Sequence, residues 1–320
     1  MTSFVRRSTH TAAVLAAVCY CLQATAFAQT GPTDQVRPAT ADTVHAEGAA
    51  GIDRAEHGLP SARTLRPLDF ITNLPGDWAR WYDRSFVAEN APVMSIIGFA
   101  TAATLITDRP VYDELNRHYT SSKSWHDFSE AATFIGDGKF QFGIAILFAG
   151  YGAVLNDSKA LRTASQITEV ILACGGVVQT LKHLTGRESP FVATQEIGRW
   201  VPFPNQIEYM NHVPHYDAYP SGHVATAMAT LTVIAENYPE QRWIPWVEYS
   251  AITCLAVGMV SNGIHWWSDY PLSIALGWGF GQVVAHPEGN AHTPGSGVST
   301  VIYPAPLPDG GLGMGFAMTW

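Results

Sequence analysis

The sequence predicts an all-α protein, and three observations lead to that prediction. Only 14% of the 320 residues are charged, against about 25% in soluble globular domains, while 47% are apolar. Six segments almost without charged residues are each too long for an ordinary strand and poor in proline. We expect them to form a six-helix bundle from residues 91–107, 140–156, 164–181, 222–236, 249–264 and 270–285.

The overall charge and the aromatic content exclude two classes of protein. A net charge of −9 argues against a binder of nucleic acid, which needs an excess of Lys and Arg. The 10 Trp, 12 Tyr and 14 Phe supply a large apolar core, which excludes a disordered chain.

The amino terminus reads as a secretory signal peptide over residues 1–28. Arg6 and Arg7 form a basic start, residues 11–25 an apolar stretch, and residues 26–28 (Ala-Phe-Ala) a cleavage site. We therefore expect a periplasmic or secreted protein. The alternative is an uncleaved membrane anchor, although the apolar stretch is short for a span.

Further segments complete the expected organisation. Residues 29–65 resemble a disordered linker, and residues 66–285 form the helical domain, whose segment 66–90 suits an amphipathic helix on a core or a membrane surface. In the polar tail 286–320, apolar residues spaced by two predict a strand, or a hairpin with residues 298–303. Cys174 and Cys254 lie in apolar runs and are expected to be buried thiols or one disulfide.

A first motif with chemical meaning is Pro220-Ser221-Gly222-His223, immediately before an apolar run. Ser221 suits a helix N-cap, and Gly222 lets a ligand approach the backbone. The free N–H groups of the helix start attract anions, and a bound phosphate would keep His223 protonated as a general acid. By itself the motif is equally consistent with a capped helix that carries an incidental histidine.

A second motif is His265-Trp-Trp-Ser-Asp269. A carboxylate one helical turn after an imidazole can accept its N–H and fix the tautomer, which leaves the other nitrogen as nucleophile or metal ligand. This spacing alone is weak, because such pairs also form structural hydrogen bonds.

A third motif runs from Lys182 to Pro190 at the end of the third apolar segment. Lys182 follows a run without charge, so its burial calls for an anion or a carboxylate. Arg187 offers a planar guanidinium suited to phosphate oxygens.

Taken in order, the three motifs resemble those of the type 2 phosphatidic-acid phosphatase/vanadium haloperoxidase superfamily, in its acid phosphatase-like branch, over residues 91–285. The resemblance implies a helical bundle and metal-independent hydrolysis of a phosphate monoester or pyrophosphate, without a cofactor. The substrate would be a phosphorylated small molecule or lipid.

The resemblance also implies roles for individual residues. His265 would attack phosphorus to give a phosphohistidine, Asp269 would orient it, and His223 would protonate the leaving oxygen. The phosphate would be held by Lys182, Arg187, Ser221 and the N–H of Gly222.

Two positions depart from the superfamily pattern. Ser189 stands where the first motif has arginine, and Met259 stands where the third has arginine. Losing one donor to transition-state charge costs about 10²–10³ in rate, so the activity could be weakened. The polar residues that could compensate are Arg199, Asn205 and Asn262.

Two other functions stay open. A metal site would use His212, His215 and Asp217, together with His223, His265 and Asp269. A catalytically degenerate envelope protein that binds a phosphorylated ligand would explain Ser189 and Met259.

The place of the chain relative to a membrane is also open. The apolar segments are mostly shorter than the ~20 residues of a span. After a cleaved signal, six crossings would put both motif-bearing loops in the cytoplasm, whereas membrane members of the resembled superfamily are expected to face outward. The sequence therefore favours a soluble or surface-bound bundle, with an integral membrane protein of the cell envelope as the alternative.

Overall fold

The structure, a computed structural model, describes residues 68–287, 299–306 and 312–319. The last two ranges are described by their backbone alone. The signal peptide predicted for residues 1–28 and the linker predicted for residues 29–65 lie outside the described residues.

Within the described residues the chain is mainly helical, and each of the six predicted segments overlaps a helix. The α-helices are α2 (Asp69–Thr72), α3 (Leu74–Ser85), α4 (Ala91–Leu105), α5 (Asp108–Ser121), α6 (Lys123–Gly136), α7 (Gly138–Leu155), α8 (Ser158–Thr185), α9 (Gln206–Asn211), α10 (Gly222–Asn237), α11 (Ile244–Ser261) and α12 (Tyr270–Ala285). The predicted count of six is not confirmed. In particular, α5 and α6 fill residues 108–136, where charged residues interrupt the apolar pattern.

The ends of the long helices follow from local sequence. Asp137 accepts a hydrogen bond from the Lys139 N–H at the start of α7, and Asp157 accepts one from the Lys159 N–H at the start of α8. Helix α8 stops at Gly186, whose φ of 56° is in the left-handed region. A Cβ at this glycine would also lie 2.1 Å from the carbonyl oxygen of Val201, so only glycine fits there.

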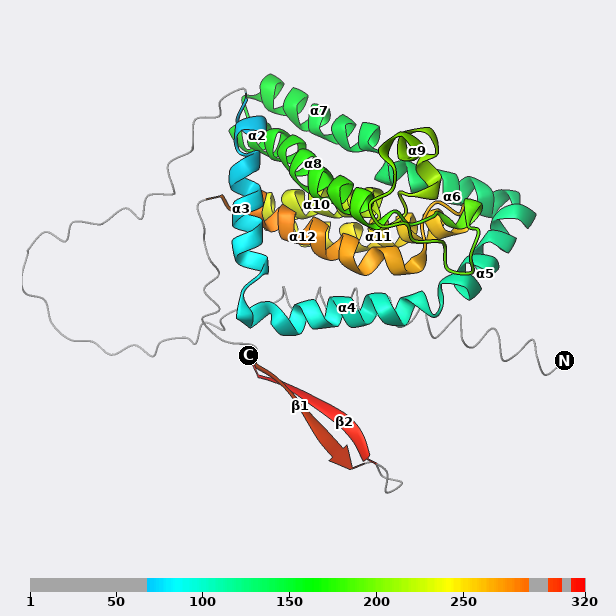
Figure 1. The fold of residues 1–320 in the computed structure, drawn as a ribbon. Coiled ribbons are helices and arrows are strands. Elements are labelled where there is room, and N and C mark those ends of the chain that lie inside the picture. The colour runs from blue at the N-terminus through cyan, green and yellow to red at the C-terminus, as the bar shows by residue number, and fades with distance from the viewer. Residues whose placement is uncertain (1–67, 288–298, 307–311, 320) are drawn as a thin grey trace, which may run out of the picture.

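Helix α10 is the centre of the bundle, since it contacts α8, α11 and α12 (Figure 1). Helix α7 packs on α8 along one edge, and α4 contacts α12 along the opposite edge. The core between α8, α10 and α12 contains fully buried side chains such as Ile167, Val233 and Phe280. The apolar character of these segments is therefore satisfied by burial between helices.

The predicted amphipathic helix in residues 66–90 is α3, which stands across one end of the bundle (Figure 1). Its Trp81 ring stacks on Phe280 with the ring centroids 4.9 Å apart. Its Trp78 Nε1 donates a hydrogen bond to the carbonyl oxygen of Ala173 at 3.0 Å. One face of α3 thus packs on the core, while Tyr82 and Phe86 remain exposed.

The other end of the bundle gathers the motif-bearing segments. Helix α8 ends just after Lys182, and α10 begins at Gly222. A short 3-10 helix, η4 (Trp267–Asp269), joins the turn after α11 to α12 and contacts α4. The packing of four long helices therefore determines where these short segments meet.

Three described helices are long and apolar enough to cross a membrane, namely α7, α8 and α11. The pair formed by α3 and the segment containing α4, bent by 67°, would make a fourth if counted as one broken span. On α7 the side chains of Ile146, Leu147 and Val154 are 70%, 73% and 78% exposed. This outer apolar surface distinguishes α7 from the buried helices.

Two remaining features concern the tail and the cysteines. Strands β1 (Ser299–Pro306) and β2 (Leu312–Thr319) pair antiparallel, with Ser299 opposite Thr319. Cys174 is buried in α8 and Cys254 lies in α11, and neither forms a disulfide.

The close contact between α10 and α12 generates a prediction. A Cβ at Gly277 would lie 2.3 Å from the Ala225 carbonyl oxygen, whereas a Cβ at Gly150 on α7 would meet nothing within 4 Å. We expect Gly277→Ala to destabilise the fold by about 1–3 kcal/mol through overpacking, and Gly150→Ala to leave it unchanged or slightly stabilised. Thermal unfolding of the two purified variants measures the difference, and equal midpoints would contradict the packing described.

Candidate active site

The three sequence motifs meet at one end of the bundle. A Cβ placed on Gly222 would lie 3.8 Å from the Lys182 Nζ, so the ammonium group lies beside the start of α10. The rings of His223 and His265 face each other edge-on, with centroids 6.0 Å apart and planes at 69°. The structure therefore brings together one lysine, two histidines and a helix N-terminus from the three motifs.

His265 is buried and held through one ring nitrogen. Its Nδ1 lies 2.7 Å from the carbonyl oxygen of Ala218 and 3.3 Å from the Oδ2 of Asp269. A carbonyl oxygen only accepts hydrogen bonds, so these neighbours assign the proton to Nδ1. The other nitrogen, Nε2, is buried without a hydrogen-bond partner among the described residues. Its lone pair is therefore free to act as a nucleophile.

The electrostatic surroundings keep His265 neutral. Burial, and after it the positive charge of Lys182, lower the pKa of its imidazole to about 3. The nucleophilic, unprotonated form is thus present at neutral pH.

Asp269 is buried beside His265 and holds the turn that carries it. Its Oδ2 accepts the backbone N–H of Trp266 at 2.8 Å, and its Oδ1 accepts an N–H of Arg187 at 2.5 Å. Burial raises the pKa of this carboxyl to about 6, while the Arg187 charge opposes the rise. Asp269 is therefore ionised at pH 7, as a partner for the Nδ1–H of His265 must be.

The acceptor for His265 is provided by chain pairing after α8. The backbone N–H of Ala218 donates to the Arg187 carbonyl oxygen at 2.9 Å, and the Thr185 hydroxyl donates to the Tyr219 carbonyl oxygen at 2.8 Å. The segment 217–219 thus lies alongside residues 185–187, and the Ala218 carbonyl is directed at His265.

The phosphate-binding candidates around α10 have a positive character. The Ser221 hydroxyl accepts the Val224 N–H at 3.4 Å, so Ser221 is the N-cap of α10, as predicted. The side chain of Lys182 is largely buried and lies 3.3 Å from the Oδ2 of Asp217. Asp217 compensates the charge of the buried Lys182. Because the two are paired, Asp217 would compete with a bound anion for the ammonium group.

Arg187, which the resemblance assigns to phosphate binding, is directed elsewhere. Its guanidinium donates five hydrogen bonds, to the Ile197 carbonyl oxygen (twice), the Ser268 hydroxyl, Asp269 and Asp108. The rings of Trp200 and Trp266 lie 4.8 and 5.3 Å from its Cζ. No N–H of this guanidinium is left for a phosphate.

The two departures from the superfamily pattern are buried positions. Ser189 and Met259 are almost completely inaccessible. Of the residues that could compensate, Arg199 pairs with Glu188 at 3.4 Å, Asn205 caps α9, and the Asn262 amide donates to the Thr133 hydroxyl at 2.9 Å. Each of the three is engaged within the protein, and Lys182 is the cation beside the start of α10.

The loop after the first motif is folded around one buried carboxylate. Glu188 accepts the backbone N–H groups of Thr194 and Arg199 at 2.9 and 2.8 Å, and these bonds lower the pKa of the carboxyl although burial opposes the shift. The segment 191–219, between the first motif and α10, contains helix α9 and exposes a group of apolar side chains, comprising Phe191, Phe203, Ile207 and Met210. The site thus has an apolar surface beside it.

The metal-site alternative has no ligand set in the described part of the chain. No group of three His, Cys, Asp or Glu side chains there could hold a metal ion. His212 lies near Glu208, His215 near Glu188, and Asp217 pairs with Lys182, so the three candidate ligands face different partners.

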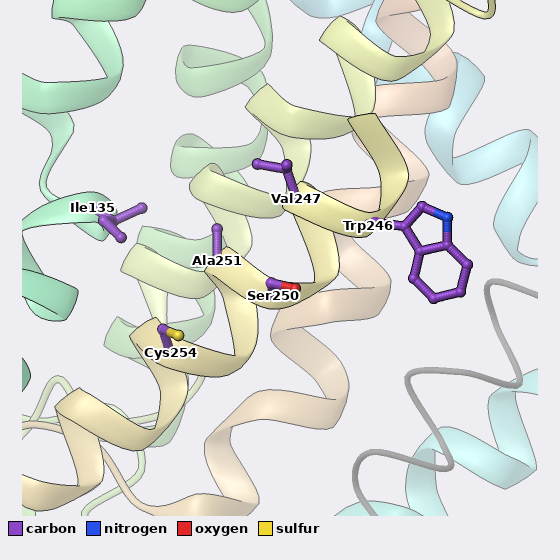
Figure 2. A pocket seen from close by; sticks show the side chains of 6 residues that line it. All are labelled: Ile135, Trp246, Val247, Ser250, Ala251 and Cys254. Atoms are coloured by element: carbon purple, nitrogen blue, oxygen red, sulfur yellow. The ribbon is translucent and has the colours of Figure 1, made fainter. Parts of the chain in front are cut away.

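An apolar hollow on the bundle is separate from these residues. Figure 2 shows it between Ile135, from the end of α6, and the outer side of α11. Its lining is Ile135, Trp246, Val247, Ser250, Ala251 and Cys254. With no charged group in its lining, this hollow is unsuited to phosphate.

Sequence reasoning missed two contributors to the site, Asp108 and the Ala218 carbonyl, and named a third, Asp217, only as a metal ligand. Asp108 and Asp217 pair with Arg187 and Lys182, and the Ala218 carbonyl oxygen accepts from His265. Asp217 could have been found by asking which acid compensates the buried lysine. Asp108 and the carbonyl carry no sequence signal, because long-range packing creates their contacts.

The fold and these contacts define a helical protein in which two histidines, a lysine and a helix N-terminus meet at one end of the bundle. The model of the PAP2 superfamily matches residues 164–291, which contain all three motifs. Over these residues the match confirms the resemblance of the motifs to the type 2 phosphatidic-acid phosphatase superfamily.

A search of solved structures gives one distant likeness. It is the crystal structure of the first transmembrane PAP2 type phosphatidylglycerolphosphate phosphatase from Bacillus subtilis, with 12% identity and a TM-score of 0.39 over 68% of this chain and 94% of that one. No curated protein matches the sequence.

The ion pair of Lys182 and Asp217 generates a prediction about anion affinity. Asp217→Asn keeps the side-chain shape and removes the carboxylate that competes for the ammonium group. We expect inorganic phosphate to bind about tenfold more tightly, because like-charge repulsion is removed. The effect should shrink with added salt.

Calorimetric titration with inorganic phosphate measures this affinity. The matched control is Glu240→Gln, which removes the exposed partner of Lys159, 2.8 Å away, from the turn after α10. Weaker phosphate binding by Asp217→Asn would mean that the carboxylate supports the site.

Proposed function

We propose that this protein hydrolyses a phosphate monoester or pyrophosphate, without a metal, through a phosphohistidine at His265. The observation that carries the proposal is the state of the imidazole. Its Nδ1–H is engaged by Ala218 and Asp269, whereas its buried Nε2 has no partner in the described part of the protein. A nucleophile held in one tautomer beside an anion site is suited to phosphoryl transfer.

In the first step the Nε2 lone pair of His265 forms a bond to phosphorus, and the bond from phosphorus to the ester oxygen breaks. Burial lowers the pKa of His223 to about 4, so His223 takes up a proton from solvent as the negatively charged phosphate binds beside it, and it donates that proton to the leaving oxygen. Asp269 stabilises the positive charge that develops on the His265 ring. Lys182, Ser221 and the N–H of Gly222 would hold the phosphate oxygens at the start of α10.

In the second step water attacks phosphorus and the bond to Nε2 breaks. His223, now neutral, takes a proton from that water. Inorganic phosphate leaves, and both histidines return to their initial states. The residues present thus complete a full cycle of bond and proton changes.

We propose a phosphorylated lipid, such as a phospholipid or an isoprenoid phosphate, as the substrate class. The support is the apolar surface beside the site, where Phe203, Ile207 and Met210 are exposed. The match of residues 164–291 to the PAP2 superfamily agrees with this class.

We also propose that the protein is an integral membrane protein of the cell envelope. The sequence alone had favoured a soluble or surface-bound bundle over this alternative. The exposed apolar side chains of α7 would be costly in water, and α7, α8 and α11 each have the length and composition of a span. Signal cleavage at residue 28 remains a prediction.

A second candidate function follows from the buried Ser189 and Met259. Without arginines at these positions, the site has Lys182 as its main cation, and that ammonium group is already paired with Asp217. A catalytically degenerate protein that binds a phosphorylated ligand without turnover would have this composition.

The test of the enzymatic proposal compares wild type with His265→Ala on phosphatidic acid, an isoprenoid pyrophosphate and p-nitrophenyl phosphate. We expect the variant to lose at least about 10³-fold in kcat, because the nucleophile is gone. His118→Ala, an exposed histidine of α5 paired with Glu114, is the matched control and should keep full activity.

Two further measurements separate the alternatives. Wild type quenched during turnover with a ³²P-labelled substrate should carry label that is lost in acid and kept in base. Activity that EDTA abolishes and zinc restores would overturn the phosphohistidine mechanism. Equal inactivity of wild type and His265→Ala, with phosphate still bound, would establish the degenerate binder.

The membrane proposal has its own test. We expect the full-length protein to stay in the membrane pellet after carbonate extraction. Its apolar helices would be held by the lipid, whereas carbonate releases proteins that are bound to the surface by charge. Release of the protein into the supernatant would contradict the membrane proposal and favour the soluble or surface-bound bundle.

A further inference from the structure

Asp108 lies at the start of α5, far from all three motifs in sequence, yet it is buried against two of them. Its Oδ1 accepts the backbone N–H of Ser268 at 2.9 Å. Its Oδ2 accepts the Ser268 hydroxyl and an N–H of Arg187, both at 2.6 Å. The side chain is fully buried, so a carboxylate here is retained for these contacts.

Arg187 thereby lies between two carboxylates. The Oδ1 of Asp269 lies 2.5 Å from one terminal nitrogen, and the Oδ2 of Asp108 lies 2.6 Å from the other. The three side chains have no exposed surface, and together they carry one net negative charge. One carboxylate alone would be neutralised by the guanidinium. The second adds a negative charge that the guanidinium does not neutralise.

The same contacts fix geometry. Ser268 precedes Asp269 in η4, and Asp108 holds both its backbone and its hydroxyl. Arg187 holds that hydroxyl and the Asp269 carboxylate together, at 2.7 and 2.5 Å. The turn that carries His265 is therefore attached to α5 and to the end of α8.

We propose that Asp108 and Arg187 are positioning residues, which hold Asp269 and its turn so that Nδ1 of His265 faces Ala218 and Nε2 faces the phosphate site. This inference rests on the hydrolysis proposed above and assigns Arg187 a role behind the nucleophile. Neither residue touches the substrate.

Turnover and ligand binding test the inference together. Asp108→Asn keeps the side-chain shape but makes the buried group neutral, and Arg187→Lys keeps the charge but cannot reach both carboxylates in a fork. In both variants we expect kcat to fall about tenfold or more, while KM and the affinity for inorganic phosphate stay within about twofold. Lys182→Met should instead weaken phosphate binding.

A matched control separates positioning from general loss of stability. Glu248→Gln changes a buried carboxylate on α11 whose partner is the Thr232 hydroxyl at 3.0 Å, and we expect wild-type kcat. Phosphate affinity that falls in parallel with kcat in Arg187→Lys would overturn the proposal, because it would make Arg187 a phosphate ligand. Wild-type kcat in Asp108→Asn would overturn it as well.

A spectroscopic measurement keeps the test independent of turnover. The Nδ1–H of His265, donated to Ala218 near Asp269, should give a strongly downfield proton signal, absent in His265→Ala. We expect this signal to move in Asp108→Asn and Arg187→Lys and to stay in Glu248→Gln. If wild type turns over no substrate, the hydrolysis proposal fails, and an unmoved signal is then the result that rejects the positioning role.

Discussion

The buried ion pair between Arg187 and Asp269 is the interaction on which the site depends. It connects the segment after α8 to the turn before α12, and both side chains are inaccessible to water. Two buried charges are expensive to desolvate, so the arrangement persists because the polar atoms of both side chains have hydrogen-bond partners. Asp108, Ser268 and the Ile197 carbonyl oxygen provide those partners. Once this network forms, the position of His265 is fixed.

The rest of the bundle is organised to keep that end of the molecule rigid. Helix α10 lies in the centre, and close packing at Gly277 and Gly281 brings α12 against it. The helix starts and ends therefore meet in a small volume, where a positive helix terminus, Lys182 and the two histidines lie together. Asp217 pairs with Lys182 and offsets the cost of burying the charge of the lysine.

The apolar side chains of the outer surface are not covered by protein, unlike those of the interior. Helix α7 exposes Ile146, Leu147 and Val154, whereas the buried faces of α8, α10 and α12 meet one another. Sequence composition reported the same scarcity of charge for both kinds of helix. It could not separate a helix buried by protein from one that needs lipid, because hydropathy counts residues and does not say which neighbours cover them.

The sequence by itself determined the helical class, the approximate positions of six of the helices and the presence of the three motifs. Those features are local, since apolar runs, caps and residue types act over a few positions. Only the tertiary structure decided that Arg187 faces Asp108 and Asp269 and that the Ala218 carbonyl oxygen fixes the tautomer of His265. It also decided that α5 and α6 are helices despite their interrupted apolar pattern. The physical reason is that the partners of a side chain depend on how distant helices pack. The spacing of residues along the sequence does not determine that packing.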